Sequence, residues 1–512
     1  MAKGVFISLY DESACGIRIL SACLKNAGHE SHVIFFKGYR NSRNKEEVSL
    51  REGEIPWEGI GPYNGEFYYA VKHAITGKEK DMLADLVSEI GPDFIGMTVN
   101  TPLLWKAIEV SAAIKKRFPS IPLVWGGFEP TVNPDGALKY CDYAARGECE
   151  YAIVDIARAM DEERDLRSIK NLSYLDKGRL LSNGLYPPCE DLSSLPFQDI
   201  SREDKYFIDG DALTKAPNFL FPSPGVYSTI TGRGCVFQCA YCCELYMKEL
   251  YKPNRYQRRR RPEEVLSELE AVKARGDINY VIFQDEIFSY DIKWLEKFLP
   301  EYKRRIGIPF TAFLYPSMDF RTKIELLKAA GMSGTCIAVQ SGSPEIAKGY
   351  NRHFDREMLL DAARILRENN LSFYTDVITY NSLETKEDLE KTLGVLLDLP
   401  QPYEICINKL YLLPGTELYN RTASPGMDDI KKNMFRFYTG LFLLAGYFKC
   451  SRALINAVKA IGIFEKDPVV LAPVLYLARF FGKLNLMKYK MNKLLKNGRL
   501  NLKYLQSKFV KT

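Results

Sequence analysis

The sequence predicts an α/β protein with three parts: an N-terminal doubly wound parallel sheet, a partial (β/α)6 barrel and a helical C-terminal region. Strand-like and helix-like stretches alternate over residues 1–150 and again over residues 226–420, which is typical of parallel sheets covered by helices. The residues between these two blocks are rich in proline and charge. At 512 residues the chain is also too long for one hydrophobic core.

The first block, residues 1–150, is predicted to be one domain. Its expected strands are Val5–Leu9, Ser31–Phe36, Phe94–Val99 and Leu123–Gly126, and its expected helices are Gly16–Gly28, Glu79–Ile90 and Leu103–Arg117. Residues 38–80 interrupt this rhythm with glycine, asparagine, proline and charges, so they are predicted to be an insertion. Residues 151–225 are predicted to be a linker across the surface, with a small hairpin at Ile169–Leu181.

The second block, residues 226–420, contains about six strand–helix units. Its expected strands are Tyr227–Thr231, Tyr280–Gln284, Phe310–Leu314, Gly334–Val339, Ser372–Ile378 and Glu404–Leu413. Its expected helices are Pro262–Gly276, Ile292–Arg305, Arg321–Ala330, Arg356–Asn369 and Lys386–Asp398. Six units are too few for a closed eight-fold barrel, so an open, partial barrel is expected. Residues 421–512 have no strand pattern and are predicted to be a helical domain.

The charge of the chain is concentrated at one end. Residues 483–512 hold nine Lys or Arg and no acidic residue, so the remaining residues carry −3 of the total net charge of +6. This tail is interleaved with apolar residues and could contact an anionic membrane surface or a nucleic acid; the alternative is a solvated helical face. The apolar runs Phe437–Phe448 and Val469–Phe481 are shorter than the ~20 residues that span a bilayer.

The N-terminus, MAKGVFISLY, lacks the long apolar stretch of a signal peptide. A cytoplasmic protein is therefore expected, with peripheral membrane contact through the basic tail as an alternative. A second basic stretch, Arg258–Arg261, directly precedes a strong helix start at Pro262–Glu264. A basic loop explains this run, and nucleic acid is not an expected partner.

Three short turns follow the predicted strands of the first domain. They are Asp11–Gly16, Thr98–Pro102 and Gly126–Thr131. Ligands of open parallel sheets bind beyond the carboxyl ends of the strands, and paired glycines let the backbone approach a flat ligand closely. Each turn alone is explained by chain reversal. Their shared position predicts a ligand site.

Three cysteines lie within eight residues after the first strand of the second block. Cys235, Cys239 and Cys242 have the spacing C-x3-C-x2-C. Thiolates are ligands for zinc or iron–sulfur centres, but structural zinc sites take four ligands, often as two paired knuckles. No second Cys or His pair of that kind occurs in the sequence. Three ligands on one loop favour a [4Fe–4S] cluster with one iron free for another ligand.

This cysteine motif, with the aromatic Tyr241 before its last cysteine, resembles the hallmark of the radical S-adenosylmethionine (SAM) superfamily. The resemblance implies that the free iron chelates SAM. It also implies a set of SAM-binding residues at the strand ends: Tyr241 beside the adenine, Asp285 and Glu286 near the amino group, and Gln340, Ser341 and Arg352 near the ribose and carboxylate. Glu384-Thr385 matches a further family motif only in part, whereas Leu413–Thr416 matches the family's final PGT turn.

The first domain resembles the Rossmann-like cobalamin-binding domain of class B radical SAM enzymes. Its three turns match the spacing of that domain's motifs, and Gly147–Glu150 resembles its closing GEGE. The resemblance implies a cobalamin site formed by Ser13, Gly16, Thr98, Asn100, Gly126, Gly127 and Glu129. Ser13 stands where the motif has the histidine that ligates cobalt from below, so no imidazole is available there. The alternative is a vestigial fold that binds no corrin.

The two resemblances together imply a radical SAM enzyme that uses a [4Fe–4S] cluster, SAM and cobalamin to methylate an unactivated carbon. The expected substrate is a small molecule, a peptide or a lipid-linked compound between the two domains, and the expected electron donor is a protein such as flavodoxin or ferredoxin.

Three other functions remain open from the sequence. One is a class B enzyme that does not methylate, such as a radical cyclase or a C–C coupling enzyme for lipids. Another is a methylthiotransferase, although the remaining cysteines show no pattern for a second cluster. The third is a non-catalytic iron–sulfur or corrin sensor.

Overall fold

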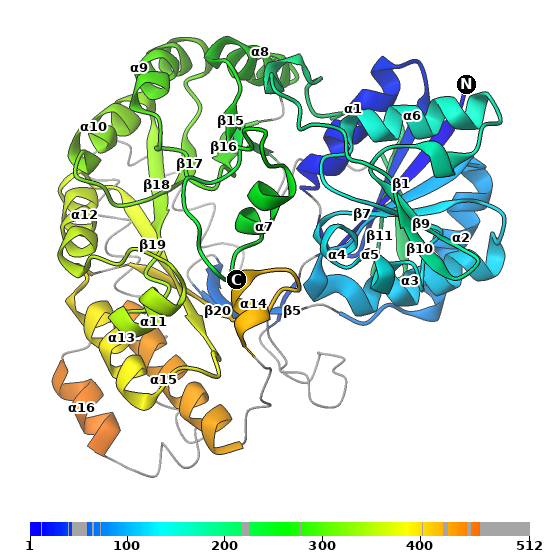
Figure 1. Ribbon diagram of the computed structural model, residues 1–512. Coiled ribbons are helices and arrows are strands. Elements are labelled where there is room, and N and C mark those ends of the chain that lie inside the picture. Colours follow the sequence, from blue (N-terminus) through cyan, green and yellow to red (C-terminus); the bar gives the residue numbers. More distant parts are fainter. Residues whose placement is uncertain are drawn as a thin grey trace.

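The structure, a computed structural model, describes residues 1–460 except 12, 39, 43–58, 64–65, 72, 217–224, 277, 402, 423–428 and 448–451. Two α/β bodies lie side by side, and each contains one nine-stranded sheet within the described part of the chain (Figure 1). The predicted fold class is confirmed. The apolar run Val469–Phe481 and the basic tail 483–512 lie outside the described residues.

The N-terminal sheet has a parallel centre with antiparallel edges. Its strand order is β10-β9-β8-β7-β6-β1-β2-β11-β12. In that order the strands are Arg179–Ser182, Leu172–Asp176, Tyr143–Ala145, Leu123–Gly126, Phe94–Thr98, Lys3–Leu9, Glu30–Phe36, Lys205–Asp209 and Ala212–Lys215. All pairs from β8 to β11 are parallel, and the edge pairs β8–β9, β9–β10 and β11–β12 are antiparallel.

Helices cover both faces of this sheet because its central strands are apolar on both sides. Val5 and Ile7 pack with α2 (Gly77–Ile90) and α3 (Leu104–Arg117), whereas Phe6 packs with α1 (Cys15–Asn26) and α6 (Glu150–Asp161). The short helices α4 (Phe128–Val132) and α5 (Pro134–Ala137) follow β7. The carboxyl ends of β1, β6 and β7 therefore lie at one edge, which brings the three predicted turns together.

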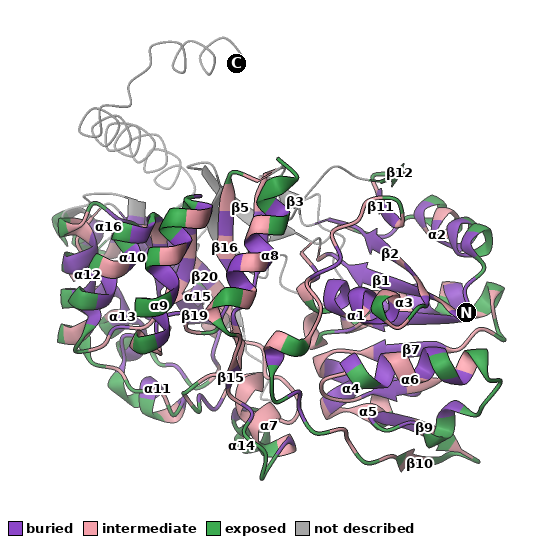
Figure 2. Cartoon of the chain, turned by 90° about the horizontal axis from the view of Figure 1, so that it is seen from above, coloured by how far each residue is buried: buried purple, intermediate pink, exposed green. Residues whose placement is uncertain are grey.

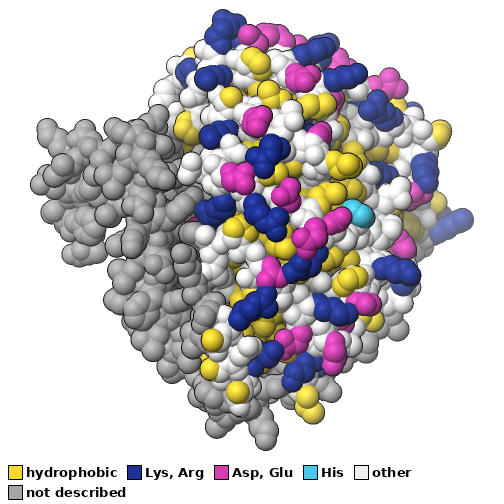
Figure 3. Space-filling view, turned by 90° about the vertical axis from the view of Figure 1, so that its left-hand side faces the viewer, with side chains coloured by type: hydrophobic (Ala, Val, Ile, Leu, Met, Phe, Trp, Pro, Cys, Tyr) yellow, Lys and Arg dark blue, Asp and Glu magenta, His cyan; other side chains and the backbone are white. Residues whose placement is uncertain are grey.

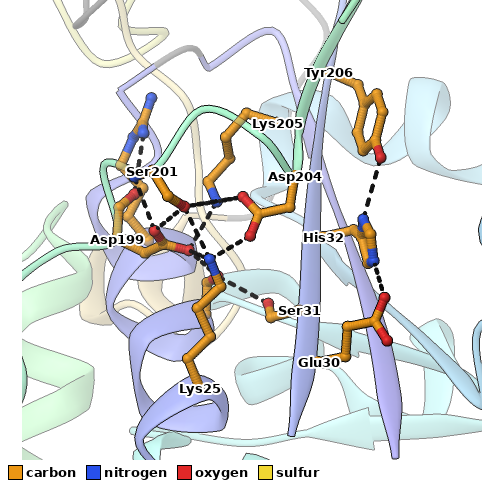
Figure 4. A network of polar contacts seen from close by, with 11 residues as sticks. Lys25, Glu30, Ser31, His32, Asp199, Ser201, Asp204, Lys205 and Tyr206 are labelled. Carbon is orange, nitrogen blue, oxygen red and sulfur yellow. Dashed lines mark hydrogen bonds and ion pairs between the residues drawn. The ribbon is translucent and has the colours of Figure 1, made fainter. Parts of the chain in front are cut away.

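The prediction of a linker over residues 151–225 is wrong for most of its length. The helix α6 and the strands β9 to β12 belong to the N-terminal domain, and the hairpin predicted at Ile169–Leu181 is β9–β10. A buried ionic network holds β11 in place (Figure 4). Asp199 lies 2.8 Å from Lys25 of α1 and 2.7 Å from Lys205 of β11, and Lys25 also pairs with Asp204. The prediction relied on local proline content. That content does not reveal that β11 pairs with β2 across about 170 residues.

The second sheet begins with the six parallel strands of the expected partial barrel. They are β13 (Val226–Thr229), β16 (Tyr280–Phe283), β17 (Phe310–Leu314), β18 (Met332–Ile337), β19 (Ser372–Thr379) and β20 (Glu404–Lys409), neighbours in that order. The outer helices are α8 (Pro262–Ala274), α9 (Ile292–Glu301), α10 (Phe320–Ala330), α12 (Arg356–Glu368) and α13 (Lys386–Asp398). Figure 2 shows buried strands inside helices whose outer sides are exposed.

The predicted insertion adds strands to this second sheet instead of to its own domain. The strands β3 (Arg40–Ser42), β4 (Gly59–Tyr63) and β5 (Glu66–Val71) extend it beyond β20 in the order β20-β4-β5-β3. The pair β4–β20 is antiparallel and joins Ile60 to Ile407. Backbone hydrogen bonds therefore connect the N-terminal part of the chain to the barrel, and the two domains are not joined by a linker alone.

The described part of the predicted C-terminal helical domain belongs to the barrel wall. The helix α15 (Asp429–Tyr447) buries Phe435, Tyr438 and Phe442 in the same core as β20 and α13, and α16 (Arg452–Ala460) adds Ile455. In the described part of the chain, no helix is both long enough and apolar enough to span a bilayer.

The outer side of the barrel, formed by the helices on the left of Figure 1, carries basic and acidic side chains interspersed with apolar ones (Figure 3). Arg321 pairs with Glu368 at 2.9 Å, and Lys391 pairs with Glu345 at 2.6 Å. Pairs this exposed contribute little to stability, about 0–1 kcal/mol each. No large field of one sign forms on this face.

Candidate functional site

The three motif cysteines lie on the loop between β13 and the helix α7 (Cys243–Leu250). The loop leaves β13 through a two-residue strand, β14 (Gly232–Arg233), which pairs with β15 (Arg258–Arg259). Gly234 then has φ +84°, and a Cβ there would lie 2.9 Å from the Gln257 backbone. Only glycine fits this turn without strain. The turn directs the chain into Cys235, so the glycine before the motif has a defined role.

The rest of the cysteine loop is held by backbone hydrogen bonds to distant elements. The amide of Ala240 donates to the carbonyl of Tyr350 at 2.8 Å, and the amide of Leu418 in α14 (Glu417–Arg421) donates to the carbonyl of Ala240 at 2.7 Å. The Lys248 ammonium donates to the Phe237 carbonyl at 2.7 Å. The predicted PGT turn thus supports this loop, because it leads directly into α14.

The cysteines fit an iron–sulfur cluster better than a single metal ion. Cys239 is buried, and Cys235 and Cys242 are partly buried. Among the described residues, no three His, Cys, Asp or Glu side chains converge closely enough to hold one ion. Thiolates of a [4Fe–4S] cluster ligate different irons and do not need to converge. Burial raises the pKa of Cys235 to about 11, so iron must displace its thiol proton on binding.

Two of the predicted SAM residues touch the cysteine loop. The Tyr241 ring packs edge-on against Tyr350, with ring centroids 5.0 Å apart. The Arg352 guanidinium lies 5.3 Å from the centre of the Tyr315 ring and donates to the Ala338 carbonyl at 3.1 Å. The Tyr315 ring in turn packs against Phe237 of the cysteine loop, with ring centroids 4.3 Å apart. The structure therefore brings these two residues together at the cluster loop.

The acidic pair after β16 divides into two different environments. Asp285 is buried and accepts hydrogen bonds from the amide of Thr231 at 3.0 Å and from its hydroxyl at 2.6 Å. It holds the start of the cysteine loop, a structural role that its position at a strand end did not reveal. Glu286 beside it is exposed and remains available for a ligand. Thr231 is a functional-loop residue that the sequence reading missed.

Gln340 and Ser341 follow β18 in a strained turn. Gln340 has φ +59°, and its amide donates to the Asp376 carbonyl at 2.7 Å. Its side-chain Oε1 is buried without a hydrogen-bond partner, which fits a polar ligand at this strand end. The Ser341 hydroxyl lies 3.4 Å from the Thr392 hydroxyl.

The buried carboxyl of Glu384 predicts a pH-dependent stability. Burial, with a smaller contribution from Asp388, raises the pKa of Glu384 from 4.5 to about 8. The folded state keeps this proton while the unfolded state loses it above pH 4.5, so stability falls as pH rises from about 4.5 to about 8. Glu384→Gln should remove about 2–4 kcal/mol of this fall in urea unfolding curves at pH 5 and pH 8. Glu387→Gln, at an exposed position in the first turn of the following helix α13, should leave the wild-type fall unchanged; equal falls in both variants would contradict the assignment.

The predicted turns of the N-terminal domain border a cavity of about 300 Å³. Gly16, Thr98, Gly126 and Gly127 line it, together with the apolar Phe6, Ile17, Val124, Ala152, Ile153 and Ile156. An apolar slot floored by glycine backbone suits insertion of a flat group, and its volume lies in the range of ligand pockets. These residues fit the binding of a corrinoid, and they would hold it between α1 and α6.

Three other predicted cobalamin residues are outside the cavity lining. The Ser13 hydroxyl donates to Asp11 at 2.5 Å, and Asn100 is exposed at the start of the next turn. Glu129 is buried, and its carboxylate accepts from Thr101 at 2.7 Å and from Asn133 at 3.1 Å. Glu129 thus joins two of the turns to each other. Whether any of the three touches a corrinoid stays a prediction.

The cavity is shared by the two domains. Ile230, Arg233 and Tyr256 of the barrel complete the wall that Gly147–Glu150 begins. Nearby, Gln198 donates to the Ser228 carbonyl at 3.0 Å. The cavity therefore lies beside the start of the cysteine loop, and Arg233 is a lining residue that the motif comparison did not identify.

Two protein-family models match the chain, each over one of these domains. The B12 binding domain matches residues 69–157, and the radical SAM superfamily matches residues 229–396, from the end of β13 into α13. These two ranges contain the cavity-lining turns after β6 and β7 and all three motif cysteines.

Curated relatives include proteins of different named activities. An uncharacterised methyltransferase from Pyrococcus horikoshii is 24% identical over 67% of this chain and 73% of its own length. An anaerobic magnesium-protoporphyrin IX monomethyl ester cyclase from Rubrivivax gelatinosus is 25% identical over 62% of this chain, which spans 56% of that cyclase. A tRNA-2-methylthio-N(6)-dimethylallyladenosine synthase from Anoxybacillus flavithermus is 30% identical, over 69% of this chain and 66% of that protein.

Among solved structures, the radical SAM methyltransferase TsrM from Kitasatospora setae, with cobalamin and a [4Fe–4S] cluster bound, has the same fold. Its TM-score is 0.58 at 17% identity, and the match covers 82% of this chain and 74% of TsrM. The two domain matches, the three-cysteine loop and the shared cavity agree with one another. The chain belongs to the radical SAM enzymes that carry a cobalamin-binding domain, and its cofactors are a [4Fe–4S] cluster, SAM and cobalamin.

Proposed function

We propose that this enzyme transfers a methyl group from SAM to an unactivated carbon of its substrate. The observation that carries the proposal is the shared cavity: Arg233, two residues before Cys235, lines the same pocket as the glycine turns of the B12 binding domain. The bound cofactors supply radical formation from SAM and methyl carriage on cobalt. Both chemistries therefore have their protein sites at one domain junction.

The chain's own contribution is to hold these sites and exclude water. The parallel strands alternate, so Ala312, Val377 and Ile407 pack under the outer helices while Phe313, Asp376 and Cys406 face the opposite, concave side. Burial raises the pKa of Asp376, and the Cys336 thiol lies 3.3 Å from its carboxylate. A concave wall with few charges suits a substrate held at an unreactive carbon, away from solvent.

A second candidate is a radical cyclisation without methyl transfer, which the cyclase relatives favour. A methylthiotransferase is less well supported. Its second cluster requires three further cysteines, but Cys23, Cys141 and Cys189, in the described part of the chain, lie far apart in the sequence, in α1, before β8 and after β10.

The deciding experiment is anaerobic turnover with SAM that carries a deuterated methyl group. The protein is reconstituted with iron, sulfide and hydroxocobalamin, reduced at low potential, and incubated with metabolite and lipid extracts of the encoding organism. Methyl transfer predicts a deuterated product, with 5′-deoxyadenosine and S-adenosylhomocysteine in equal amounts. 5′-Deoxyadenosine with neither deuterated product nor S-adenosylhomocysteine would exclude methylation and leave the cyclase-type reaction.

A further inference from the structure

A buried network of four charged side chains joins the two domains at the wall of the shared cavity. The Arg233 guanidinium lies 3.2 Å from one carboxylate oxygen of Glu148 and 2.5 Å from the Glu150 carboxylate. Arg258 donates to Glu148 at 3.0 Å and to the Cys189 carbonyl at 2.6 Å. Both acids belong to the N-terminal domain and both arginines to the barrel. The network is therefore the ionic contact between the domains at this point.

These charges are removed from solvent and balanced. The side chains of Arg258, Glu150, Glu148 and Arg233 are 5%, 8%, 9% and 15% exposed. Two positive and two negative charges leave no net charge. Removing one partner of a buried pair leaves an uncompensated charge, which is strongly destabilising. The relative position of the two domains is thus strongly specified here.

Glycine and tyrosine fix the acidic side of the network. Gly147 has φ +74°, and a Cβ at this position would lie 2.2 Å from the Tyr251 hydroxyl oxygen. That hydroxyl accepts the amide of Glu148, and the Asn171 side chain donates to the Glu148 carbonyl at 2.9 Å. Residues 147–150, which line the cavity, therefore have little freedom apart from the position of their carboxylates.

Arg233 connects this segment directly to the cluster loop. It is paired with Arg258 in the two-stranded β14–β15 ladder, and Gly234 separates it from Cys235. Its guanidinium lines the cavity together with Glu148 and Glu150. Arg233 thus has two roles. It lines the cavity, and its backbone, paired with Arg258, fixes where the cysteine loop begins.

We propose that Arg233 is a positioning residue that makes cobalamin binding and cluster binding cooperative. A corrinoid in the cavity restricts the carboxylates of Glu148 and Glu150, and these carboxylates restrict Arg233 and the turn into Cys235. A loop that is already ordered loses less conformational entropy when it binds the cluster. By linkage, the cluster must raise corrinoid affinity by the same factor as the corrinoid raises cluster affinity. This inference holds whichever reaction the enzyme performs.

The test measures the affinity of the full-length protein for hydroxocobalamin with and without the cluster. Titrations on reconstituted and iron-free protein give two dissociation constants for each variant. Wild type should bind hydroxocobalamin at least about 5-fold more tightly when the cluster is present, a typical size for coupling between sites. The coupling ratio is the dissociation constant without the cluster divided by that with the cluster. Arg233→Gln should reduce the coupling ratio to within 2-fold of one. Arg233→Lys keeps the charge but cannot contact Glu148 and Glu150 with two guanidinium nitrogens, so it should give an intermediate coupling ratio.

The matched control is Arg261→Gln. Arg261 follows β15, is 61% exposed, and pairs with Asp191 at 3.3 Å and Glu264 at 3.1 Å. Its replacement should therefore leave the ratio of the two dissociation constants at the wild-type value. Glu150→Gln breaks the same buried pair from the other domain, so it provides a second test if Arg233→Gln folds poorly. It should also bring the ratio of the two dissociation constants close to one.

Hydrogen exchange gives an independent readout. Hydroxocobalamin should protect residues 230–242 in wild type but not in Arg233→Gln or Glu150→Gln. A wild-type ratio of one, or an unchanged ratio in both variants, would overturn the proposal. Neither result bears on methyl transfer, which the deuterium experiment tests separately.

Discussion

Replacing Cys235, Cys239 or Cys242 by alanine should reduce reductive cleavage of SAM to the level of a protein-free control. Each cysteine is expected to ligate a different iron, so a single loss leaves a [4Fe–4S] cluster with too few protein ligands. Asp285 is not available to replace a lost thiolate, because both of its carboxylate oxygens accept hydrogen bonds from Thr231. Iron and sulfide per chain, the electron paramagnetic resonance signal of the reduced cluster, and 5′-deoxyadenosine formation measure the effect.

Cys243 is the matched control for this series. It begins α7 directly after Cys242 and is also partly buried. Cys243→Ala should keep the full iron content and SAM cleavage, since adjacent cysteines seldom ligate one cluster. Loss of the cluster in Cys243→Ala together with its retention in Cys242→Ala would exchange the roles of these two residues and contradict the motif assignment.

The parallel strands β1, β2, β6 and β7 and the six barrel strands could be predicted because each is a local apolar run in a segment where strands and helices alternate. The strands contributed by residues 38–80 and by residues 205–215 could not. The pair β4–β20 joins residues almost 350 positions apart, and β11 depends on ion pairs from Lys25 on α1. Pairing over such separations leaves no periodic signal in a local window, so both segments resembled irregular chain.

The functional site divides along the same line. The cysteine loop could be predicted because three ligands and an aromatic residue lie within eight positions. Asp285 does follow a strand end as expected, but the sequence does not reveal that Thr231 donates hydrogen bonds to both of its carboxylate oxygens. A role of Asp285 in SAM binding stays a prediction. Arg233 was missed for the same reason: its partners Glu148 and Glu150 lie more than 80 residues away. The sequence did offer one indication of a role for Arg233, because it is a charged residue only two positions before the first motif cysteine.

Replacing Gly127, at the glycine floor of the cavity, should strongly weaken the affinity for hydroxocobalamin. Gly127 has φ +99° and ψ −165°, a combination that is essentially restricted to glycine. A Cβ there would lie 2.9 Å from the Val99 carbonyl oxygen and 3.2 Å from the Thr98 hydroxyl. Gly127→Ala must therefore push apart the turns after β6 and β7, which both line the cavity.

The expected result of Gly127→Ala is at least a 100-fold weaker affinity for hydroxocobalamin, about 2.7 kcal/mol, with iron content after reconstitution unchanged. Absorbance titration and iron analysis of the same preparation measure both quantities. Gly178→Ala is the matched control: Gly178 also has a positive φ, +80°, in the β9–β10 turn, but a Cβ there meets nothing within 4 Å. It should carry the backbone strain of about 1–2 kcal/mol without weakening the affinity. Wild-type affinity in Gly127→Ala would place the corrinoid elsewhere, because no ligand that reaches this floor could tolerate displacement of both turns.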